Sequence, residues 1–286
     1  MKQKIVDAVL AILAHLWLIF MVSIVLIPML WMIMAAFTKG DALTGVPLWP
    51  DLSKFSMEHF DYVFYYSAME NAVMSDYWAA FLRTLTIAVV NLFGVVIFAV
   101  ITGYTFARLR FKGKKNLLLL MMVLQMFPSF MGMLALYLLY RQFGMTNNPA
   151  LLALIYTAGS IPYNTFLVRG FMRNIPKSLD ESAAIDGATP LQTLTKILFP
   201  LIVPIIGFIA VGAFMAPWLD YMLQSRFLRE PTIATWLYNL VAGGNSAYKP
   251  LDFMAGALII AIPIMIVQFF MQKYMVYGLT SGAEKG

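Results

Sequence analysis

Long apolar stretches separated by charged gaps are the main pattern of this chain. Six segments contain no Asp, Glu, Lys or Arg. Each can supply the roughly 20 mostly apolar residues that a membrane-spanning helix needs. The pattern predicts an all-α integral membrane protein with six transmembrane helices. The predicted spans are Ala8–Thr38, Thr84–Ala107, Asn116–Tyr140, a fourth within Pro149–Val168, Ile197–Leu219 and Phe253–Gln272.

The basic residues predict the orientation of these spans. Alternate gaps hold 13 of the 20 lysines and arginines, including the cluster from Arg108 to Lys115. Because Lys and Arg accumulate in cytoplasmic loops, both termini are expected in the cytoplasm. The net charge of +6 therefore reflects topology and contact with anionic membrane lipid, and we expect no nucleic-acid partner.

The composition offers little catalytic chemistry. Of the residues, 61% are hydrophobic and 12% charged, and Cys is absent. His15 and His59 are far apart, whereas zinc sites need three or four clustered ligands, so no metal site is expected. No glycine-rich loop followed by Lys and Ser or Thr is present, so we expect no cofactor on this chain. The spans also lack the ionisable groups that usually mark ion-driven transporters. We therefore expect no metal chemistry on this chain, and any energy for transport would come from another protein.

The gap between the fourth and fifth predicted spans contains two helix-start signals. Ser178 with Glu181, and Thr189 with Gln192, each match a capping box, and a proline follows Thr189. Between them, Gly187 can adopt a positive φ and end the first helix. The loop is predicted to contain a short helix, a glycine turn and a second helix that leads into the fifth span.

The short helix is expected to present small side chains to a partner. Ser182, Ala183 and Ala184 would allow a close approach, and Asp180 and Glu181 lie near the positive N-terminal end of the helix. By capping alone, an ordinary interfacial helix is an equally good interpretation.

The spacing in this loop resembles the Glu-Ala-Ala signature of binding-protein-dependent ABC importer permeases. The chain reads Glu181-Ser182-Ala183, three residues, Gly187, nine residues, then Ile197-Leu198-Phe199-Pro200. Ser182 replaces the first alanine of the signature, and Phe199 replaces its leucine. The resemblance implies the type I ABC importer permease architecture and a transport subunit without enzymatic activity.

The resemblance also implies how the loop works. Residues 169–196 would form a cytoplasmic coupling-helix loop that docks on an ATPase subunit, and that separate subunit would hold ATP and Mg. The residues implied in ATPase coupling are Ser178, Asp180, Glu181, Ser182, Ala183, Ala184, Asp186 and Gly187.

A closer resemblance, strongest in residues 179–204 and 278–286, is to the smaller membrane subunits of maltose and maltodextrin importers. It implies one permease domain over residues 1–286 and a cytoplasmic tail over residues 278–286. The tail would contact the ATPases through Thr280, Ser281, Gly282, Ala283 and Glu284. The last external loop would face the binding protein through Gly243, Gly244, Asn245, Ser246 and Tyr248. By its composition, a plain solvent loop is an equally good interpretation.

The assembly implied by this resemblance lies in the bacterial cell membrane. It contains a homologous second permease subunit, two ATPase subunits and an extracytoplasmic solute-binding protein, and it would import a sugar, with maltodextrin as the best candidate, by alternating access. An ion-coupled secondary transporter and a noncatalytic membrane scaffold or receptor subunit are the alternatives. The sequence identifies no residue that contacts the sugar.

Overall fold

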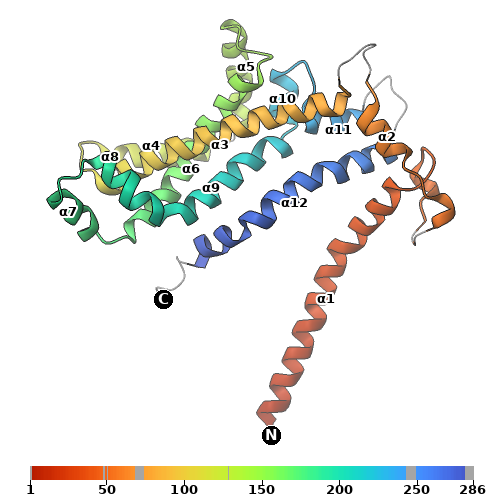
Figure 1. The fold of residues 1–286 in the computed structure, drawn as a ribbon, viewed down its shortest axis with the longest axis horizontal. Coiled ribbons are helices and arrows are strands. Elements are labelled where there is room, and N and C mark those ends of the chain that lie inside the picture. The colour runs from red at the N-terminus through yellow and green to blue at the C-terminus, as the bar shows by residue number, and fades with distance from the viewer. Residues whose placement is uncertain are drawn as a thin grey trace. The chain divides into compact units, whose positions relative to one another are not determined.

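The computed structural model describes residues 2–47, 49, 51–67, 74–127, 129–242 and 249–280. Within these ranges the regular structure is helical, apart from one isolated bridge between Thr38 and Phe55. The chain divides into two compact units (Figure 1). Unit 1 comprises residues 1–77 and 237–261, and unit 2 comprises residues 78–236 and 262–286.

Three long helices, α3 (Asp76–Arg108), α6 (Pro149–Arg173) and α9 (Phe199–Leu219), run through unit 2 (Figure 1). Its shorter helices are α4 (Lys114–Met126), η3 (Ser129–Gly132), α5 (Met133–Gln142), α7 (Ser178–Ile185), α8 (Pro190–Gln192), the π-helix η4 (Thr193–Leu198) and α10 (Met222–Phe227). Unit 1 contains α1 (Lys2–Ala36), η1 (Leu43–Gly45), η2 (Leu52–Lys54) and α2 (Glu58–Tyr65). Two more helices contribute to both units, α11 (Ile233–Ala242) and α12 (Pro250–Thr280), and the first two residues of α3 belong to unit 1.

Five described stretches are long and apolar enough to cross a membrane: Val9–Ala36, Asp76–Arg108, Pro149–Arg173, Pro190–Leu219 and Pro250–Gln272. They correspond to five of the six predicted spans. The segment predicted as the third span, residues 116–140, is not one helix but is divided between α4 and α5. The end of α4 has a local cause. Phe127 precedes Pro128 in the sequence and is extended, with φ −76° and ψ 130°, as expected for a residue before proline.

The helices of unit 2 pack closely around an apolar core. Buried residues of α3, α6, η4 and α9 form this core, among them Val100, Met172, Leu198 and Ile202. A Cβ atom added at Gly103 of α3 would lie only 2.5 Å from a methyl group of Val168 on α6. Glycine therefore allows the backbones of these two helices to approach.

Buried polar side chains add specific contacts between the long helices. The Thr157 hydroxyl of α6 donates to the Asn91 side chain of α3 over 3.0 Å, and the Asn91 amide donates to the Ala213 carbonyl of α9 over 2.7 Å. Such bonds contribute about 0.6 kcal/mol on average between membrane helices. They fix the register of α3, α6 and α9.

A buried ion pair joins α2 and α12 in unit 1. His59 Nδ1 lies 2.6 Å from Asp252 Oδ1, and His59 Nε2 lies 3.0 Å from the Thr38 carbonyl oxygen. Lys249 Nζ lies 3.7 Å from the other oxygen of Asp252 and 3.7 Å from the centre of the Tyr62 ring. We refer to this group of residues as the α2–α12 junction.

Candidate coupling site

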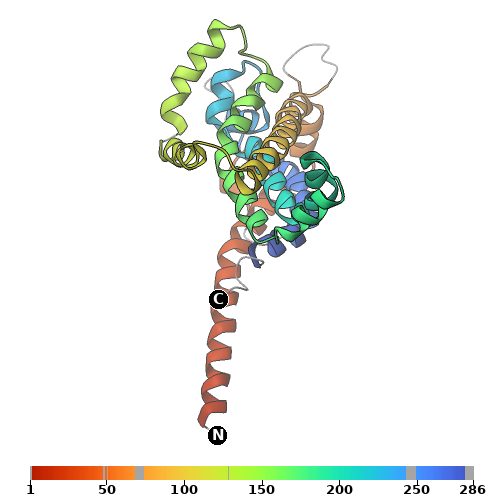
Figure 2. The same ribbon diagram turned by 90° about the vertical axis from the view of Figure 1, so that its left-hand side faces the viewer.

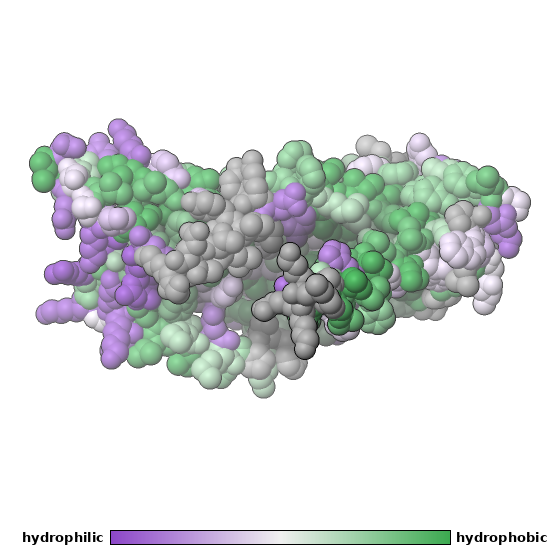
Figure 3. Space-filling view, turned by 90° about the horizontal axis from the view of Figure 1, so that it is seen from below, coloured by the Kyte–Doolittle hydropathy of each residue, from purple (hydrophilic) through white to green (hydrophobic). Residues whose placement is uncertain are grey.

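The loop between α6 and α9 is built from the predicted pair of short helices. Figure 2 shows the end of unit 2 that carries α7 and α8 facing the viewer. Hydrophilic side chains gather at the same end of unit 2, beside apolar surface along the long helices (Figure 3). We call residues 174–192, which include α7 and α8, the docking loop.

The first helix of the loop starts differently from the prediction. Ser178 is the first residue of α7, and the N-cap position belongs to Lys177, which makes no side-chain capping bond. Lys177 has helical φ and ψ of −70° and −20°, whereas a capping residue needs extended backbone. The predicted capping box of Ser178 and Glu181 is therefore wrong. Glu181 and Asp180 still lie in the first turn, where a negative charge favours the helix.

The end of α7 confirms the prediction for Gly187. This residue has φ +78°. Its amide donates to the Ala184 carbonyl over 3.1 Å, and the Ala188 amide donates to the Ala183 carbonyl over 2.9 Å. These two bonds form a Schellman motif, which satisfies carbonyls that the helix leaves unpaired.

The second predicted capping box is also confirmed. The Thr189 amide donates to Gln192 Oε1 over 2.8 Å, and the Gln192 amide donates to Thr189 Oγ1 over 3.3 Å. Pro190 occupies the first turn of α8, where a missing N–H costs no hydrogen bond. From Pro190 the chain is helical through α8, η4 and α9 to Leu219.

The residues of α7 divide into a buried face and an exposed face. Ala183 is buried, so the prediction that it faces a partner is wrong. Ser178, Glu181, Ser182, Ala184, Asp186 and Gly187 are exposed, as predicted for a docking surface. The sequence reading missed Ile185, which is 87% exposed. Ile185 therefore adds an apolar side chain to the exposed face of α7.

An ion pair ties the start of α7 to the end of α3. Arg108 Nε lies 3.0 Å from Asp180 Oδ2, and Arg108 Nη2 donates to the Ile175 carbonyl over 3.0 Å. The Arg108 side chain is only 6% exposed. Asp180 thus points back into its own chain, and Arg108 positions the docking loop. The sequence gives no local signal for this contact, because the two residues are 72 positions apart in the numbering.

A wide groove lies elsewhere in unit 2, lined by residues of α4, α5, α6, α9 and α10. Its volume is about 1360 Å³, and Tyr156, Tyr163 and Tyr221 are part of its lining. The Tyr156 hydroxyl donates to Asp220 Oδ2 over 2.8 Å and accepts from Gln224 Nε2 over 3.1 Å. The groove therefore combines aromatic surface with an oriented polar group.

Two predicted sites lie outside the residues that can be described. The loop of Gly243, Gly244, Asn245, Ser246 and Tyr248 is one. The other is the tail of Ser281, Gly282, Ala283 and Glu284. Thr280 is the last residue of α12. Their roles remain predictions.

Comparison with known proteins identifies the family. Residues 95–279 match the family described as binding-protein-dependent transport system inner membrane component. The chain belongs to this family. The match includes the docking loop, all of α6 and α9 and the C-terminal part of α3. This member is therefore a permease subunit of a membrane transport system and not an enzyme.

Individual relatives agree with the family match. The chain is 37% identical to the galactooligosaccharides transport system permease protein GanQ of Bacillus subtilis, over 96% of this chain and 95% of the relative. It is 33% identical to the maltodextrin transport system permease protein MalD of Streptococcus pneumoniae, with the same coverage. The fold matches a chain of a bacterial ABC transporter that imports the polysaccharide alginate, with a TM-score of 0.78 at 22% identity, over 94% of this permease and 97% of that chain.

Proposed function

We propose that this permease imports an oligosaccharide, driven by ATP hydrolysis on separate ATPase subunits. The observation that carries the proposal is the docking loop. An exposed helix is joined through a glycine turn to a helical stretch that runs on into a long apolar helix. Such an arrangement passes movement of a docked partner to the span. GanQ and MalD, named for galactooligosaccharide and maltodextrin transport, indicate the class of substrate.

Six crossings with both termini in the cytoplasm account best for the helix arrangement. Arg108 at the end of α3 donates to Ile175, which follows the end of α6. Nearer the starts of the same helices, Ile87 of α3 and Leu152 of α6 share a second buried cluster. The two helices therefore run parallel, and residues 109–148 between them must return across the membrane. We assign this return to α4 and α5, and the docking loop is then cytoplasmic by its basic residues.

The complete importer in this proposal contains a homologous second permease, two ATPase subunits with ATP and Mg, and an extracytoplasmic binding protein. Loaded binding protein and ATP would favour an outward-facing state, and hydrolysis would reset it, which requires each ligand to bind the two states unequally. The groove of α4, α5, α6, α9 and α10 is our candidate for the part of the sugar pathway on this chain. Its tyrosines offer flat aromatic faces to pyranose rings.

Reconstitution tests this function. Liposomes with the full assembly should accumulate labelled maltodextrin or galactooligosaccharide only when ATP, ATPase and loaded binding protein are all present. Accumulation by the permease alone under a sodium or proton gradient would instead make it an ion-coupled transporter. A further outcome is that a binding protein loaded with a different solute stimulates the ATPase of the same assembly. If it does so while no sugar is taken up, the sugar assignment is refuted.

A pair of variants tests the docking surface separately. Ile185→Asp places a charge on the exposed face of α7 and should reduce binding of the ATPase at least about tenfold, since an interface core disfavours an unpaired charge. Leu52→Asp changes a residue that is 88% exposed outside the docking loop and serves as the matched control. Equal ATPase affinities of the two variants would argue against docking through α7.

A further inference from the structure

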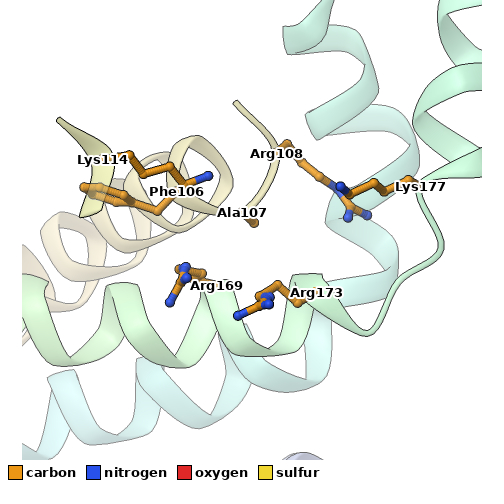
Figure 4. A pocket seen from close by; sticks show the side chains of 7 residues that line it. All are labelled: Phe106, Ala107, Arg108, Lys114, Arg169, Arg173 and Lys177. Atoms are coloured by element: carbon orange, nitrogen blue, oxygen red, sulfur yellow. The ribbon is translucent and has the colours of Figure 1, made fainter. Parts of the chain in front are cut away.

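A basic pocket lies beside the docking loop, where α3 and α6 end and α4 begins (Figure 4). Its volume is about 350 Å³, within the range of small-molecule sites, about 300–1000 Å³. Phe106 lines one part of it. The other lining residues include five basic side chains: Arg108, Lys114, Arg169, Arg173 and Lys177.

The positive charge of this pocket is poorly compensated. Within the described part of the chain, only Arg108 of the five basic residues forms an ion pair, with Asp180. Arg169 Nε is buried and has no hydrogen-bond partner among the described residues. Burial lowers the pKa of Lys114, and the positive charges of Arg169, Lys177 and Arg173 lower it further. A bound anion would relieve both the repulsion and the unmet hydrogen bond.

The donors in the pocket suit a phosphate group. Arg169 and Arg173 are four residues apart on α6 and therefore lie on one face of the helix. Figure 4 shows their guanidinium groups on the same side of the pocket, with the Lys114 ammonium group across from them. Guanidinium forks bind phosphate oxygens in pairs, and an ammonium adds a compact charge. A carboxylate of a protein partner would leave several of these donors unused.

The surroundings of the pocket favour a membrane lipid as the source of that phosphate. Arg108, Arg169 and Arg173 are in the last turns of two membrane-spanning helices, where lipid headgroups lie. Directly after Lys114, α4 exposes an apolar surface, with Leu117, Leu119 and Leu120 between 44% and 52% exposed. Acyl chains can lie against this surface while the headgroup enters the pocket. Basic pockets between spans on the cytoplasmic side are typical lipid-headgroup sites.

We propose that this pocket binds the phosphate of an anionic phospholipid from the cytoplasmic leaflet, with Arg169, Arg173 and Lys114 as its main ligands. The site rests on the cytoplasmic placement of the docking loop in the proposed function, but it is independent of the transported sugar. Because Arg108 and Lys177 connect the pocket to α7, the bound lipid would stand next to the docking helix.

Binding of spin-labelled phosphatidylglycerol to the full importer in phosphatidylcholine nanodiscs tests the site. Replacing both Arg169 and Arg173 by Gln should weaken this binding about tenfold or more, since both guanidinium groups then lose their charge-assisted hydrogen bonds to the phosphate. The matched control replaces Lys112 and Lys115, which are exposed and line no part of the pocket, by Gln. The control removes the same charge but should change binding about twofold or less at physiological salt.

A second pair of variants separates ligand binding from folding. Arg169→Lys with Arg173→Lys keeps the charge and should retain more binding than the Gln pair, though less than wild type because the forked donors are lost. If the Gln pair assembles normally and binds phosphatidylglycerol as the Lys112/Lys115 control does, the site does not exist.

Two further measurements distinguish the other sources of an anion. Inorganic phosphate, added to the nanodiscs, should not displace the spin-labelled lipid, and displacement at millimolar phosphate would make this a site for a soluble phosphate.

In pure phosphatidylcholine, the Gln pair should bind the ATPase as wild type does. Loss of ATPase binding there, with lipid binding unchanged, would make the pocket a protein-docking surface and overturn the proposal. Sugar uptake by the wild-type assembly remains a separate readout of the proposed function.

Discussion

The docking loop and the α2–α12 junction each depend on one ion pair between distant residues, but the two regions use it differently. In the docking loop, Arg108 and Asp180 hold an exposed helix whose own shape comes from local motifs. In the junction, His59 and Asp252 are 193 positions apart and are both buried. An arginine stays protonated at every pH a cell meets, whereas a histidine can lose its proton near neutrality. The ion pair of the docking loop therefore keeps its charges at cellular pH, whereas the ion pair of the junction responds to pH.

The geometry of His59 explains this difference. Both ring nitrogens face acceptor oxygens, those of Asp252 and Thr38. Both contacts can be hydrogen bonds only when both nitrogens carry a proton, which means a charged imidazolium. Burial by itself lowers the pKa of His59. The hydrogen bonds to Asp252 and Thr38 and the negative charges of Asp252 and Glu58 outweigh this effect and raise the pKa above its ordinary value.

The largest effect is expected from breaking the junction. His59→Leu leaves the Asp252 carboxylate buried, with the more distant Lys249 as its one ion-pair partner among the described residues, so local stability should fall by about 3 kcal/mol. Protease sensitivity around residues 39–66 in the purified importer measures this loss. The double variant His59→Leu with Asp252→Leu removes both charges and should recover most of it. A double variant as sensitive as the single one would show that packing, and not charge, holds the junction.

A smaller effect is expected from the corresponding change in the docking loop. Arg108→Gln unpairs Asp180, but this carboxylate is 24% exposed and can bind water. We expect a loss of about 1–2 kcal/mol in docking-loop stability and a weaker stimulation of the ATPase by loaded binding protein. Asp180→Asn should behave similarly. If hydrogen exchange in α7 is as slow in these variants as in wild type, the ion pair does not position the helix.

The next effect in size is expected from a substitution in the turn after α7. At φ +78° a β-branched side chain is strained even though nothing lies within 4 Å of the position. Gly187→Val should therefore cost about 1–2 kcal/mol locally and misalign α7 without blocking membrane insertion. Gly45→Val is the control, since Gly45 lies outside the docking loop, does not have a positive φ and also has open space around it. Normal ATPase coupling in Gly187→Val would contradict this role of the turn.

The pH response is expected to be smaller, because a neutral His59 keeps one of its two hydrogen bonds. Since its pKa is raised on folding, the stabilisation is complete below about pH 6.5 and is lost as pH rises through the folded-state pKa. Protection of residues 39–66 from protease should therefore decrease from pH 6 to mildly alkaline pH by about 1 kcal/mol. Hydrogen exchange in α7 should show no matching change. A junction that becomes more stable at alkaline pH would refute the charged state of His59.

The smallest effect concerns Glu181 on the exposed face of α7. Our hypothesis is that it contacts a basic residue of the ATPase. Since it makes no capping bond in α7, Glu181→Gln tests the charge with little change to the helix. An exposed charge pair contributes about 0.2–1 kcal/mol, so ATPase affinity should fall up to about fivefold and recover relative to wild type at high salt. Unchanged affinity at low salt would remove Glu181 from the interface.

The two regions also differ in how far they could be predicted from sequence. In the docking loop, Gly187 and the Thr189 capping box were predicted correctly because the signals lie within a few residues of the structure they cause. The prediction that Ser178 caps α7 was wrong because the backbone is already helical at Lys177. No residue in the capping-box motif indicates that the helical conformation begins one residue earlier. Partners in the junction come together only through tertiary packing. The same holds for Asp180, whose partner Arg108 lies on α3. No residue of the motif indicates that Ala183 is buried.

The helical stretch from Pro190 to Leu219 is uninterrupted. A small tilt at the docking loop therefore produces a larger displacement at the far end of this stretch. Its 30 residues extend for roughly 45 Å at 1.5 Å per residue. A tilt of about 5° at the docking-loop end would move the far end by about 4 Å, provided the helix does not bend. The π-helical turns of η4 lie just before Pro200, which has no N–H to donate, and are the natural point for the helix to bend. In the proposed function, the stiffness of that short stretch would set how much of the ATPase movement reaches the opposite face of the membrane.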